Sequence, residues 1–232
     1  MRVALFGGSF DPPHVGHQLA CLYVRLTYGV DEVWMIPVFR HAFEKRSVAY
    51  AHRVAMCERA TAELGPFARV CTIERELAGE QELAGPSYTL LTVRALKARY
   101  PEHEFALIIG ADLIKERERW YGWTELAQLV PFLILARGGS DSVLRPLPPA
   151  RDQFHPEGVL LPEVCSTEVR ARLRAGQLPR GWVSRGVLAY ICEQGLYGAS
   201  EASFLNSRSD SGAVQQLEPR PESAGDGQRG SE

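Results

Sequence analysis

The chain has 232 residues, of which 45% are hydrophobic and 23% charged, so it is long and apolar enough to bury a sizeable core. A formal net charge of −2 argues against a broad polyanion-binding surface, and we expect no nucleic-acid partner. The five cysteines form no CxxC pair and are odd in number, which favours the reducing cytosol over a disulfide framework. The sequence shows neither a signal-peptide pattern nor a membrane-length apolar run, so we expect a cytoplasmic protein without a membrane partner.

Short apolar runs alternate with segments of helical period along the chain. The runs that predict buried strands are 3–7, 32–38, 69–74, 105–111, 131–136 and 158–162. Helices are predicted over 14–29, 49–64 and 89–101, and Pro101 ends the last of them. This alternation is typical of βαβ units and predicts an α/β fold, a Rossmann-like doubly wound parallel sheet with helices on both faces. Ligands of such a sheet bind beyond the carboxyl ends of its strands.

The first predicted helix follows the first strand directly. Its apolar side chains Leu19, Leu22, Tyr23 and Leu26 fall on one stripe at helical spacing. This stripe is the pattern on which the helix prediction depends.

Two regions depart from the alternation. Residues 138–157 are rich in proline and polar residues and are predicted to form a long loop. From Ala199 onward the composition shifts to Ser, Glu, Gly, Gln and Arg, with Phe204 the only aromatic residue. Such a segment cannot bury enough apolar surface to offset its ordering entropy, so a disordered tail is expected over 199–232. The folded domain is expected to span residues 1–198.

The strand-to-helix turn GGSFDPPHVGH (residues 7–17) is the strongest chemical signal. Gly7 and Gly8 permit a tight turn and let a phosphate approach the backbone amides closely. His14 and His17 lie three residues apart on the first helical turn, where the helix dipole favours an anion. An isolated HxxH pair also occurs as a surface or capping pair, and no third ligand lies near enough in sequence to favour a metal. The turn therefore predicts an anion site suited to a polyphosphate.

The second signal is VCSTEVRARLRAG (residues 164–176), near the end of the folded part. Ser166 and Thr167 can cap a helix while offering hydroxyls and amides to phosphate oxygens. Arg170 follows one turn later, and its guanidinium suits bidentate phosphate contact. A plain helix start has the same composition. Together with the histidine turn, however, the segment would close a phosphate site from the other side.

These motifs resemble those of one protein superfamily. GGSFDPPHVGH is similar to the G-S-F-D-P-x-H-x-G-H signature of the adenylyl- and cytidylyltransferases, and CSTEVR is similar to their S-S-T-x-I-R motif. Three further segments resemble bacterial nicotinate-nucleotide adenylyltransferases: PSYTLLTVRAL (86–96), GADLIKERERWYGWTEL (110–126) and GVLAYICEQGLYG (186–198). The similarity covers nearly all of residues 1–198 in the same order, which marks this part as a nucleotidyltransferase catalytic domain.

The resemblance implies that ATP and nicotinate mononucleotide react, with Mg²⁺ assisting, to give the dinucleotide and pyrophosphate, without a protein nucleophile. The implied catalytic residues, which contact the phosphates, are His14, His17 and Arg170. The implied ATP-binding residues are Gly7, Gly8, Ser9, Phe10, Gly110, Asp112, Ser166 and Thr167. The implied mononucleotide-binding residues are Thr89, Trp120, Tyr121, Lys45, His41 and Arg137. Since no third ligand lies near the two histidines, we expect no protein-bound metal, and the oligomeric state stays open.

Several alternatives stay open at this stage. The acceptor could be nicotinamide mononucleotide, or the enzyme could be another adenylyl- or cytidylyltransferase, using for example phosphopantetheine. A nucleotide-binding regulator without turnover is a third alternative. Trp120 and Trp123 would also suit a packing pair, and 39–46 an ordinary loop. Two departures from the family pattern concern the details of the site: Cys165 replaces a serine, and FRHAFEK lacks the P-P-H-K pattern.

Overall fold

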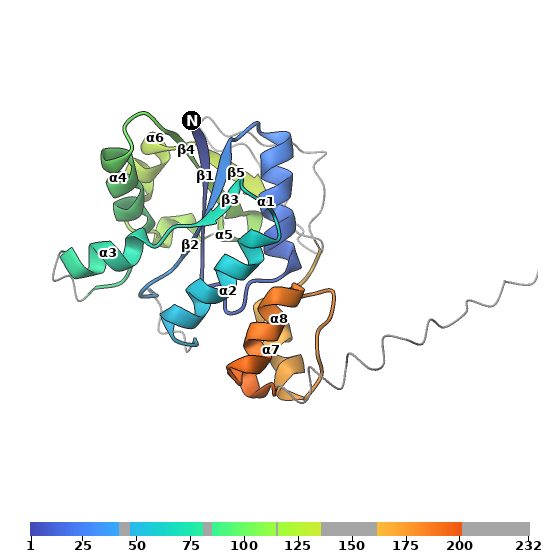
Figure 1. Ribbon diagram of the computed structural model, residues 1–232. Coiled ribbons are helices and arrows are strands. Elements are labelled where there is room, and N and C mark those ends of the chain that lie inside the picture. The colour runs from blue at the N-terminus through green and yellow to red at the C-terminus, as the bar shows by residue number, and fades with distance from the viewer. Residues whose placement is uncertain (42–46, 81–84, 115, 136–161, 201–232) are drawn as a thin grey trace, which may run out of the picture.

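The computed structural model describes residues 1–41, 47–80, 85–114, 116–135 and 162–200. Its strands are β1 (Arg2–Gly8), β2 (Glu32–Pro37), β3 (Ala68–Val70), β4 (Glu104–Gly110) and β5 (Phe132–Leu135). Its helices are α1 (Val15–Thr27), α2 (Tyr50–Ala62), α3 (Ile73–Glu80), α4 (Thr89–Arg99), α5 (Ala111–Ile114), α6 (Trp123–Leu129), α7 (Ser166–Arg174) and α8 (Arg185–Glu193). Two short 3-10 helices are η1 (Arg117–Arg119) and η2 (Leu196–Gly198) (Figure 1).

The described strands form one parallel sheet in the order β3-β2-β1-β4-β5. From the central strand β1 the chain builds outward through β2 and β3, and it then crosses back to β4 on the other side of β1. The strand order therefore reverses between β1 and β4, and this switch point is where open α/β sheets bind ligands. The predicted doubly wound parallel fold is confirmed.

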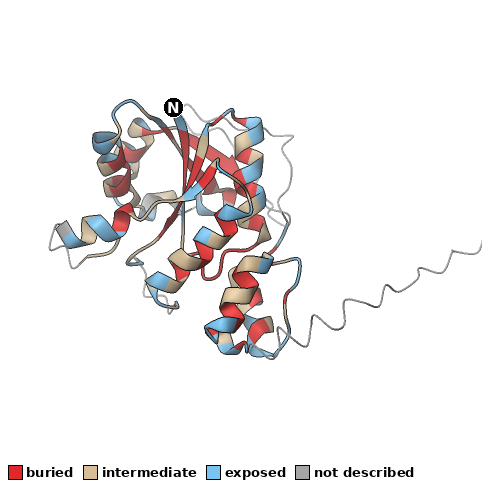
Figure 2. Ribbon diagram, in the orientation of Figure 1, coloured by how far each residue is buried: buried red, intermediate tan, exposed pale blue. Residues whose placement is uncertain are grey.

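Both faces of the sheet are covered, and the side chains of β1 alternate between them. Ala4 and Phe6 pack toward α1 and α2, whereas Val3 and Leu5 pack toward α3, α4 and α6. Figure 2 shows the buried residues concentrated along the strands and on the helix faces turned toward them. This burial on two sides explains why the strands read as continuous apolar runs.

The C-terminal part of the described chain packs on α2 and not on the sheet. Helices α7 and α8 and the 3-10 helix η2 form a third apolar cluster with Met56 and Ala60 of α2 (Figure 1). Ala199, at the start of the predicted tail, is buried in this cluster. Three predictions fall wholly or mostly outside the described residues: the loop over 138–157, the strand over 158–162 except its last residue, and the tail beyond residue 200.

The predicted strand over 69–74 is wrong in its second half. Strand β3 ends at Val70, and helix α3 begins at Ile73. Glu74 and Glu76 lie in the first turn of α3, where acidic side chains interact favourably with the helix dipole. The apolar run therefore divides between a short edge strand and the start of a helix.

The predicted apolar stripe of the first helix is wrong for its three leucines, whereas Tyr23 packs against the cluster on the sheet side. The residues of α1 buried against the sheet side are Gly16, Ala20, Cys21 and Val24. Leu26 is 75% exposed, and Leu19 and Leu22 are more than one-third exposed. The small residues let the helix backbone lie close to the aromatic side chains at the end of β1, so close packing and not side-chain size decides which face is buried.

This reversal of faces can be tested by a pair of truncations on α1. Val24 is fully buried, so Val24→Ala should lower the free energy of unfolding by about 2 kcal/mol. Leu26→Ala removes more carbon atoms from an exposed position and should change that free energy by less than about 0.5 kcal/mol. Urea denaturation of both variants measures the difference. A larger loss of unfolding free energy for Leu26→Ala than for Val24→Ala would show that the leucines face the core.

Candidate active site

The turn after β1 is anchored by the buried side chain of Phe10. Phe10 has a positive φ of 47° and is 2% exposed, and its ring meets Phe6 and His17 edge-on with centroids 5.5 and 5.0 Å apart. A Cβ atom at Gly8 would lie 3.0 Å from the Phe10 ring. The second glycine is therefore required by this close approach, which brings the backbone of the turn to the sheet edge.

The two histidines form the start of α1. His14 is its N-cap residue, and the backbone N–H of His14 donates to Nδ1 of His17 at 3.1 Å. With Nδ1 as the acceptor, the neutral His17 ring carries its proton on Nε2. The ring centroids lie 3.7 Å apart. The capping alternative and the anion-site hypothesis are thus compatible, since the cap itself orients the ring of His17.

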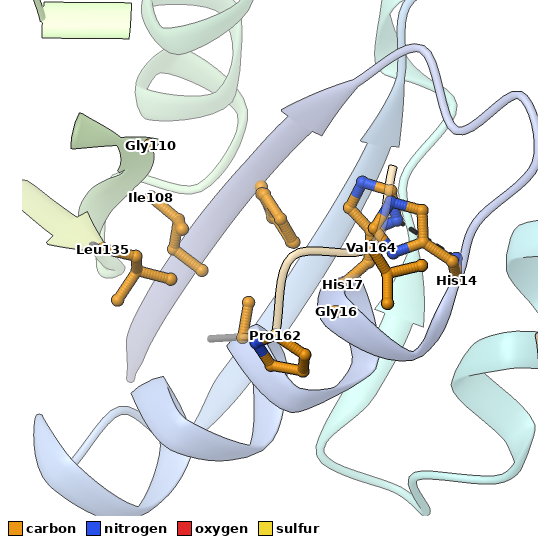
Figure 3. Close-up of a pocket in the computed structure, with 10 residues that line it drawn as sticks. His14, Gly16, His17, Ile108, Gly110, Leu135, Pro162 and Val164 are labelled. Atoms are coloured by element: carbon orange, nitrogen blue, oxygen red, sulfur yellow. Dashed lines mark hydrogen bonds between the residues drawn. The ribbon is translucent and has the colours of Figure 1, made fainter. Parts of the chain in front are cut away.

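A pocket opens beside the two imidazoles, between the sheet and the segment before α7. Its lining residues are Phe6, His14, Gly16, His17, Ala20, Ile108, Gly110, Leu135, Pro162 and Val164. Figure 3 shows the imidazoles side by side at one end of the pocket and Ile108 and Leu135 at the other. A Cβ atom at Gly16 would come within 3.1 Å of the His14 ring, so glycine is needed there to keep this ring in place. The pocket combines apolar walls with polar groups at one end, as ligand sites commonly do.

The serine-threonine-arginine segment docks directly on the histidine turn. The Ser166 hydroxyl donates to the carbonyl of Pro12 at 2.9 Å. The Arg170 guanidinium donates to the carbonyl of Asp11 at 2.7 Å and to the Thr167 hydroxyl at 3.2 Å. The structure therefore brings together two motifs that lie more than 150 residues apart in sequence. Cys165 is the exposed N-cap residue of α7, in the position of the expected serine.

The segments expected to bind the mononucleotide also meet. The backbones of Arg40 and Ser87 are hydrogen-bonded at 2.8 Å, which joins the segment after β2 to the segment before α4. Tyr88 stacks on Tyr121 with ring centroids 4.6 Å apart, which joins the start of α4 to the loop before α6. Thr89 is the first residue of α4 and lies within this arrangement.

The tryptophans beside Tyr121 differ in their packing. Trp120 is half-buried and meets Trp123 edge-on with ring centroids 6.0 Å apart. Trp123 stacks in turn on Phe132 of the sheet, with ring centroids 4.9 Å apart. Trp123 is therefore a packing residue, and Trp120 lies one layer farther out.

Other expected residues are placed only in part. Gly110 ends β4 and lines the pocket, and His41 is exposed at the end of a described segment. Lys45 and Arg137 lie outside the described residues. Asp112 lies in α5, but its side chain is outside the described part as well.

Comparison with known proteins agrees with this geometry. The family model of cytidylyltransferase-like proteins matches residues 5–172. A protein of Anaeromyxobacter sp. (strain K) named "Probable nicotinate-nucleotide adenylyltransferase" is 42% identical over 196 residues, which cover 84% of this chain and 96% of that protein. A protein of the same name from Salinibacter ruber is 41% identical over 200 residues, covering 85% and 98%. The chain belongs to the cytidylyltransferase-like family.

A solved structure shares the cytidylyltransferase-like fold of this chain. It is "Plasmodium falciparum nicotinic acid mononucleotide adenylyltransferase complexed with NaAD", with a TM-score of 0.69 and 19% sequence identity. The alignment covers 84% of this chain and 97% of that chain. At this level of identity the likeness concerns the fold, and it confirms the Rossmann-like architecture.

Sequence reasoning missed the buried charged residues of this cytidylyltransferase-like site. Asp11 is 1% exposed and forms an ion pair with Arg170 at 3.7 Å, and the Tyr197 hydroxyl donates to it at 2.7 Å. Arg53 of α2 is 4% exposed and donates to the carbonyl of Ser9 at 3.0 Å. Asp11 lies in the motif GGSFDPPHVGH and Tyr197 in GVLAYICEQGLYG, so the sequence could have drawn attention to both residues. Arg53 has no local sequence signal.

Glu74 is a further missed residue, on the mononucleotide side. One of its carboxylate oxygens accepts the backbone N–H of Phe39 at 2.9 Å, and the other accepts the Thr92 hydroxyl at 3.3 Å. Burial raises the pKa of Glu74, and the hydrogen bonds from Phe39, Ser87 and Thr92 oppose that increase. Glu74 thus ties the segment after β2 to helix α4 through a single buried carboxyl group.

The raised pKa of Glu74 predicts a pH-dependent difference from Glu74→Gln. Above the ordinary value of 4.5 the folded protein keeps the Glu74 proton that the unfolded chain releases, so stability falls as pH rises through the folded pKa. The variant does not titrate here. Its free energy of unfolding relative to wild type should therefore increase as the pH rises above the ordinary value of 4.5. Urea denaturation across this range measures it, and Glu58→Gln at an exposed position controls for the loss of a carboxylate. A constant difference would contradict the assignment.

Proposed function

We propose that this protein transfers AMP from ATP to nicotinate mononucleotide, giving nicotinate adenine dinucleotide and pyrophosphate in NAD biosynthesis. The observation that carries the proposal is the docking of the helix of Arg170 on the turn of His14 and His17, beside the pocket at the switch point of the sheet. The relatives that cover most of the chain have names that state this activity.

The reaction needs positioning and charge stabilisation and no protein nucleophile. An oxygen of the mononucleotide 5′-phosphate forms a bond to the α-phosphorus of ATP. The bond from that phosphorus to the bridging oxygen breaks, and pyrophosphate leaves with the electron pair. In this proposal the Nε2–H of His17 donates to the oxygens on which charge grows, with His14 beside it and Arg170 on the β- and γ-phosphates.

The apolar part of the pocket suits the adenosine of ATP. Ile108 and Leu135 provide apolar contacts for a base, and Gly110 leaves room for a ribose close to the backbone. Among the described residues, no group of three His, Cys, Asp or Glu side chains could hold a metal ion. We assign Mg²⁺ to the substrate, as MgATP, where it neutralises phosphate charge.

The acceptor is assigned to the cluster formed by the residues before α4 and α6. The amino-terminal end of α4 begins at Thr89, and a helix end of this kind interacts more favourably with a carboxylate than with an amide. This favours nicotinate over nicotinamide. Trp120 and Tyr121 lie beside it and provide aromatic faces for an electron-poor ring.

Cellular location follows from the same proposal. No helix in the described ranges is long and apolar enough to cross a membrane. All five cysteines, each within those ranges, are free thiols, as the reducing cytosol maintains them. We place the enzyme in the cytoplasm, with ATP and nicotinate mononucleotide as its small-molecule partners.

The direct test is pyrophosphate release by the purified protein with MgATP and either nicotinate or nicotinamide mononucleotide. We expect kcat/KM for the acid to exceed that for the amide at least tenfold, a difference of about 1.4 kcal/mol. A preference for the amide would keep the reaction and reassign the acceptor pocket. Turnover only with phosphopantetheine or with CTP would replace the proposal by another nucleotidyltransferase. Binding of ATP without turnover on any acceptor would favour the alternative of a nucleotide-binding regulator.

His17→Ala tests the role of the oriented imidazole. Loss of one preorganised donor to the transition state should lower kcat by about 100-fold or more. The melting temperature should change little by comparison. His103→Ala is the matched control, because His103 lies next to β4 at the opposite end of the sheet and packs on Tyr100. Equal effects of the two substitutions on kcat would contradict a catalytic role for His17.

A further inference from the structure

The Leu-Tyr-Gly segment near the end of the described chain has no role in the reaction as set out so far. It forms η2, and its Leu196 is buried in the C-terminal cluster. Tyr197 has φ +56° and ψ 20°, a left-handed conformation that a bulky residue seldom adopts. A conformation of this kind persists only where surrounding contacts hold it, and it often marks a functional site. The contact that holds Tyr197 therefore needs an explanation.

The Tyr197 hydroxyl donates to Asp11, 186 residues earlier in the sequence, at 2.7 Å. The same oxygen, Oδ1, also accepts the backbone N–H of Val48 at 3.3 Å. Burial raises the pKa of Tyr197, and the hydrogen bond and charge of Asp11 add to the increase. The hydroxyl therefore stays protonated and acts as the donor. Two donors thus fix one oxygen of a carboxylate that is only 1% exposed.

The other oxygen of Asp11 faces Arg170. Oδ2 lies 3.7 Å from the guanidinium, whereas the carbonyl of Asp11 lies 2.7 Å from it. The side chain of Arg170 is 13% exposed, so the pair is only weakly screened by solvent. Arg170 is thus held mainly by a neutral carbonyl, with the charged oxygen kept about one ångström farther away.

We propose that Tyr197 is a positioning residue that limits how tightly Asp11 holds Arg170 and thereby leaves Arg170 available to the triphosphate of ATP. The inference rests on the proposed function, in which Arg170 contacts the β- and γ-phosphates. Without the phenolic hydroxyl, the buried Oδ1 loses its shortest hydrogen bond, and the carboxylate gains by turning toward the nearest cation. Arg170 would then form a tighter pair with Asp11 and bind phosphate less well.

Tyr197 lies outside the residues that the family model matches. The cytidylyltransferase-like match ends at residue 172, just beyond Arg170, and does not include η2. The contact between Tyr197 and Asp11 therefore links a segment outside the match to the motif of the first turn. Tyr197 touches neither reacting group in this arrangement, so its effect is transmitted through Asp11.

Tyr197→Phe tests the proposal, because it removes the hydroxyl and keeps the ring. The matched control is Tyr190→Phe on α8, which removes another hydroxyl from the same cluster, one that is hydrogen-bonded to His52 at 2.9 Å. Tyr197→Phe should raise both the KM and the calorimetric Kd for MgATP roughly fivefold to tenfold. The KM for nicotinate mononucleotide should stay within about twofold. Tyr190→Phe should leave all three constants within about twofold of wild type.

A second variant separates positioning from packing. Asp11→Asn removes the charge that competes with phosphate for Arg170, so it should lower the Kd for MgATP severalfold. Tyr197→Phe added to Asp11→Asn should have no further effect on that Kd. Equal weakening of ATP binding by Tyr197→Phe in both backgrounds would overturn the proposal, as would a fall in melting temperature with no change in Kd. Should Tyr197→Phe not fold, an unchanged or higher Kd of Asp11→Asn for MgATP would overturn the proposal.

Failure of the proposed function gives a different result. A wild-type protein that binds MgATP but releases no pyrophosphate with any acceptor contradicts the proposed reaction. The Kd comparison between Tyr197→Phe and Tyr190→Phe does not require turnover, so it still tests the inference in that case.

Discussion

A single buried carboxylate, that of Asp11, joins the histidine turn to the C-terminal segment that carries Arg170 and Tyr197. It lies in the turn after β1, and it is reached by Arg170 from α7, by Tyr197 from η2 and by the backbone of Val48. Removing one partner of a buried ion pair leaves the other charge uncompensated, at a cost of about 3–5 kcal/mol. If the C-terminal cluster moved away from the histidine turn, the Asp11 carboxylate would therefore lose its ion pair with Arg170 and its hydrogen bond from Tyr197.

The catalytic geometry follows from this constraint. Ser166 donates to Pro12, the residue after Asp11, so the start of α7 and the backbone that leads to α1 move as one unit. Helix α1 then begins at a pair of imidazoles whose orientation depends on the hydrogen bond between the N–H of His14 and Nδ1 of His17. The groups proposed to bind phosphate thus come from two distant segments that are hydrogen-bonded to each other. Preorganisation of this kind avoids the cost of ordering the groups during the reaction.

Much of this arrangement could be predicted from the sequence, because it depends on local patterns. The strands are buried on both faces and therefore read as apolar runs, and the carboxyl end of β1 is where a glycine-rich turn must place its histidines. What could not be predicted depends on distant contacts. The outward-facing Leu26 shows that close approach of α1 to the sheet outweighed the apolar pattern. Arg53 and Glu74 sit in ordinary helical segments, and only the fold brings buried partners to them.

The acceptor side is built differently, and this difference has a functional consequence. Its parts come from three separate segments that meet through the contact of Arg40 with Ser87 and the stack of Tyr88 on Tyr121. Glu74 ties the first of these segments to α4, and none of these contacts involves Asp11. Under the proposed function, substitutions on this side would change which mononucleotide is bound while leaving the proposed phosphate site intact. Substitutions at Asp11 affect the element that both motifs share. The part proposed to bind ATP is thus the more constrained one, and the proposed function allows specificity for the acceptor to vary around it.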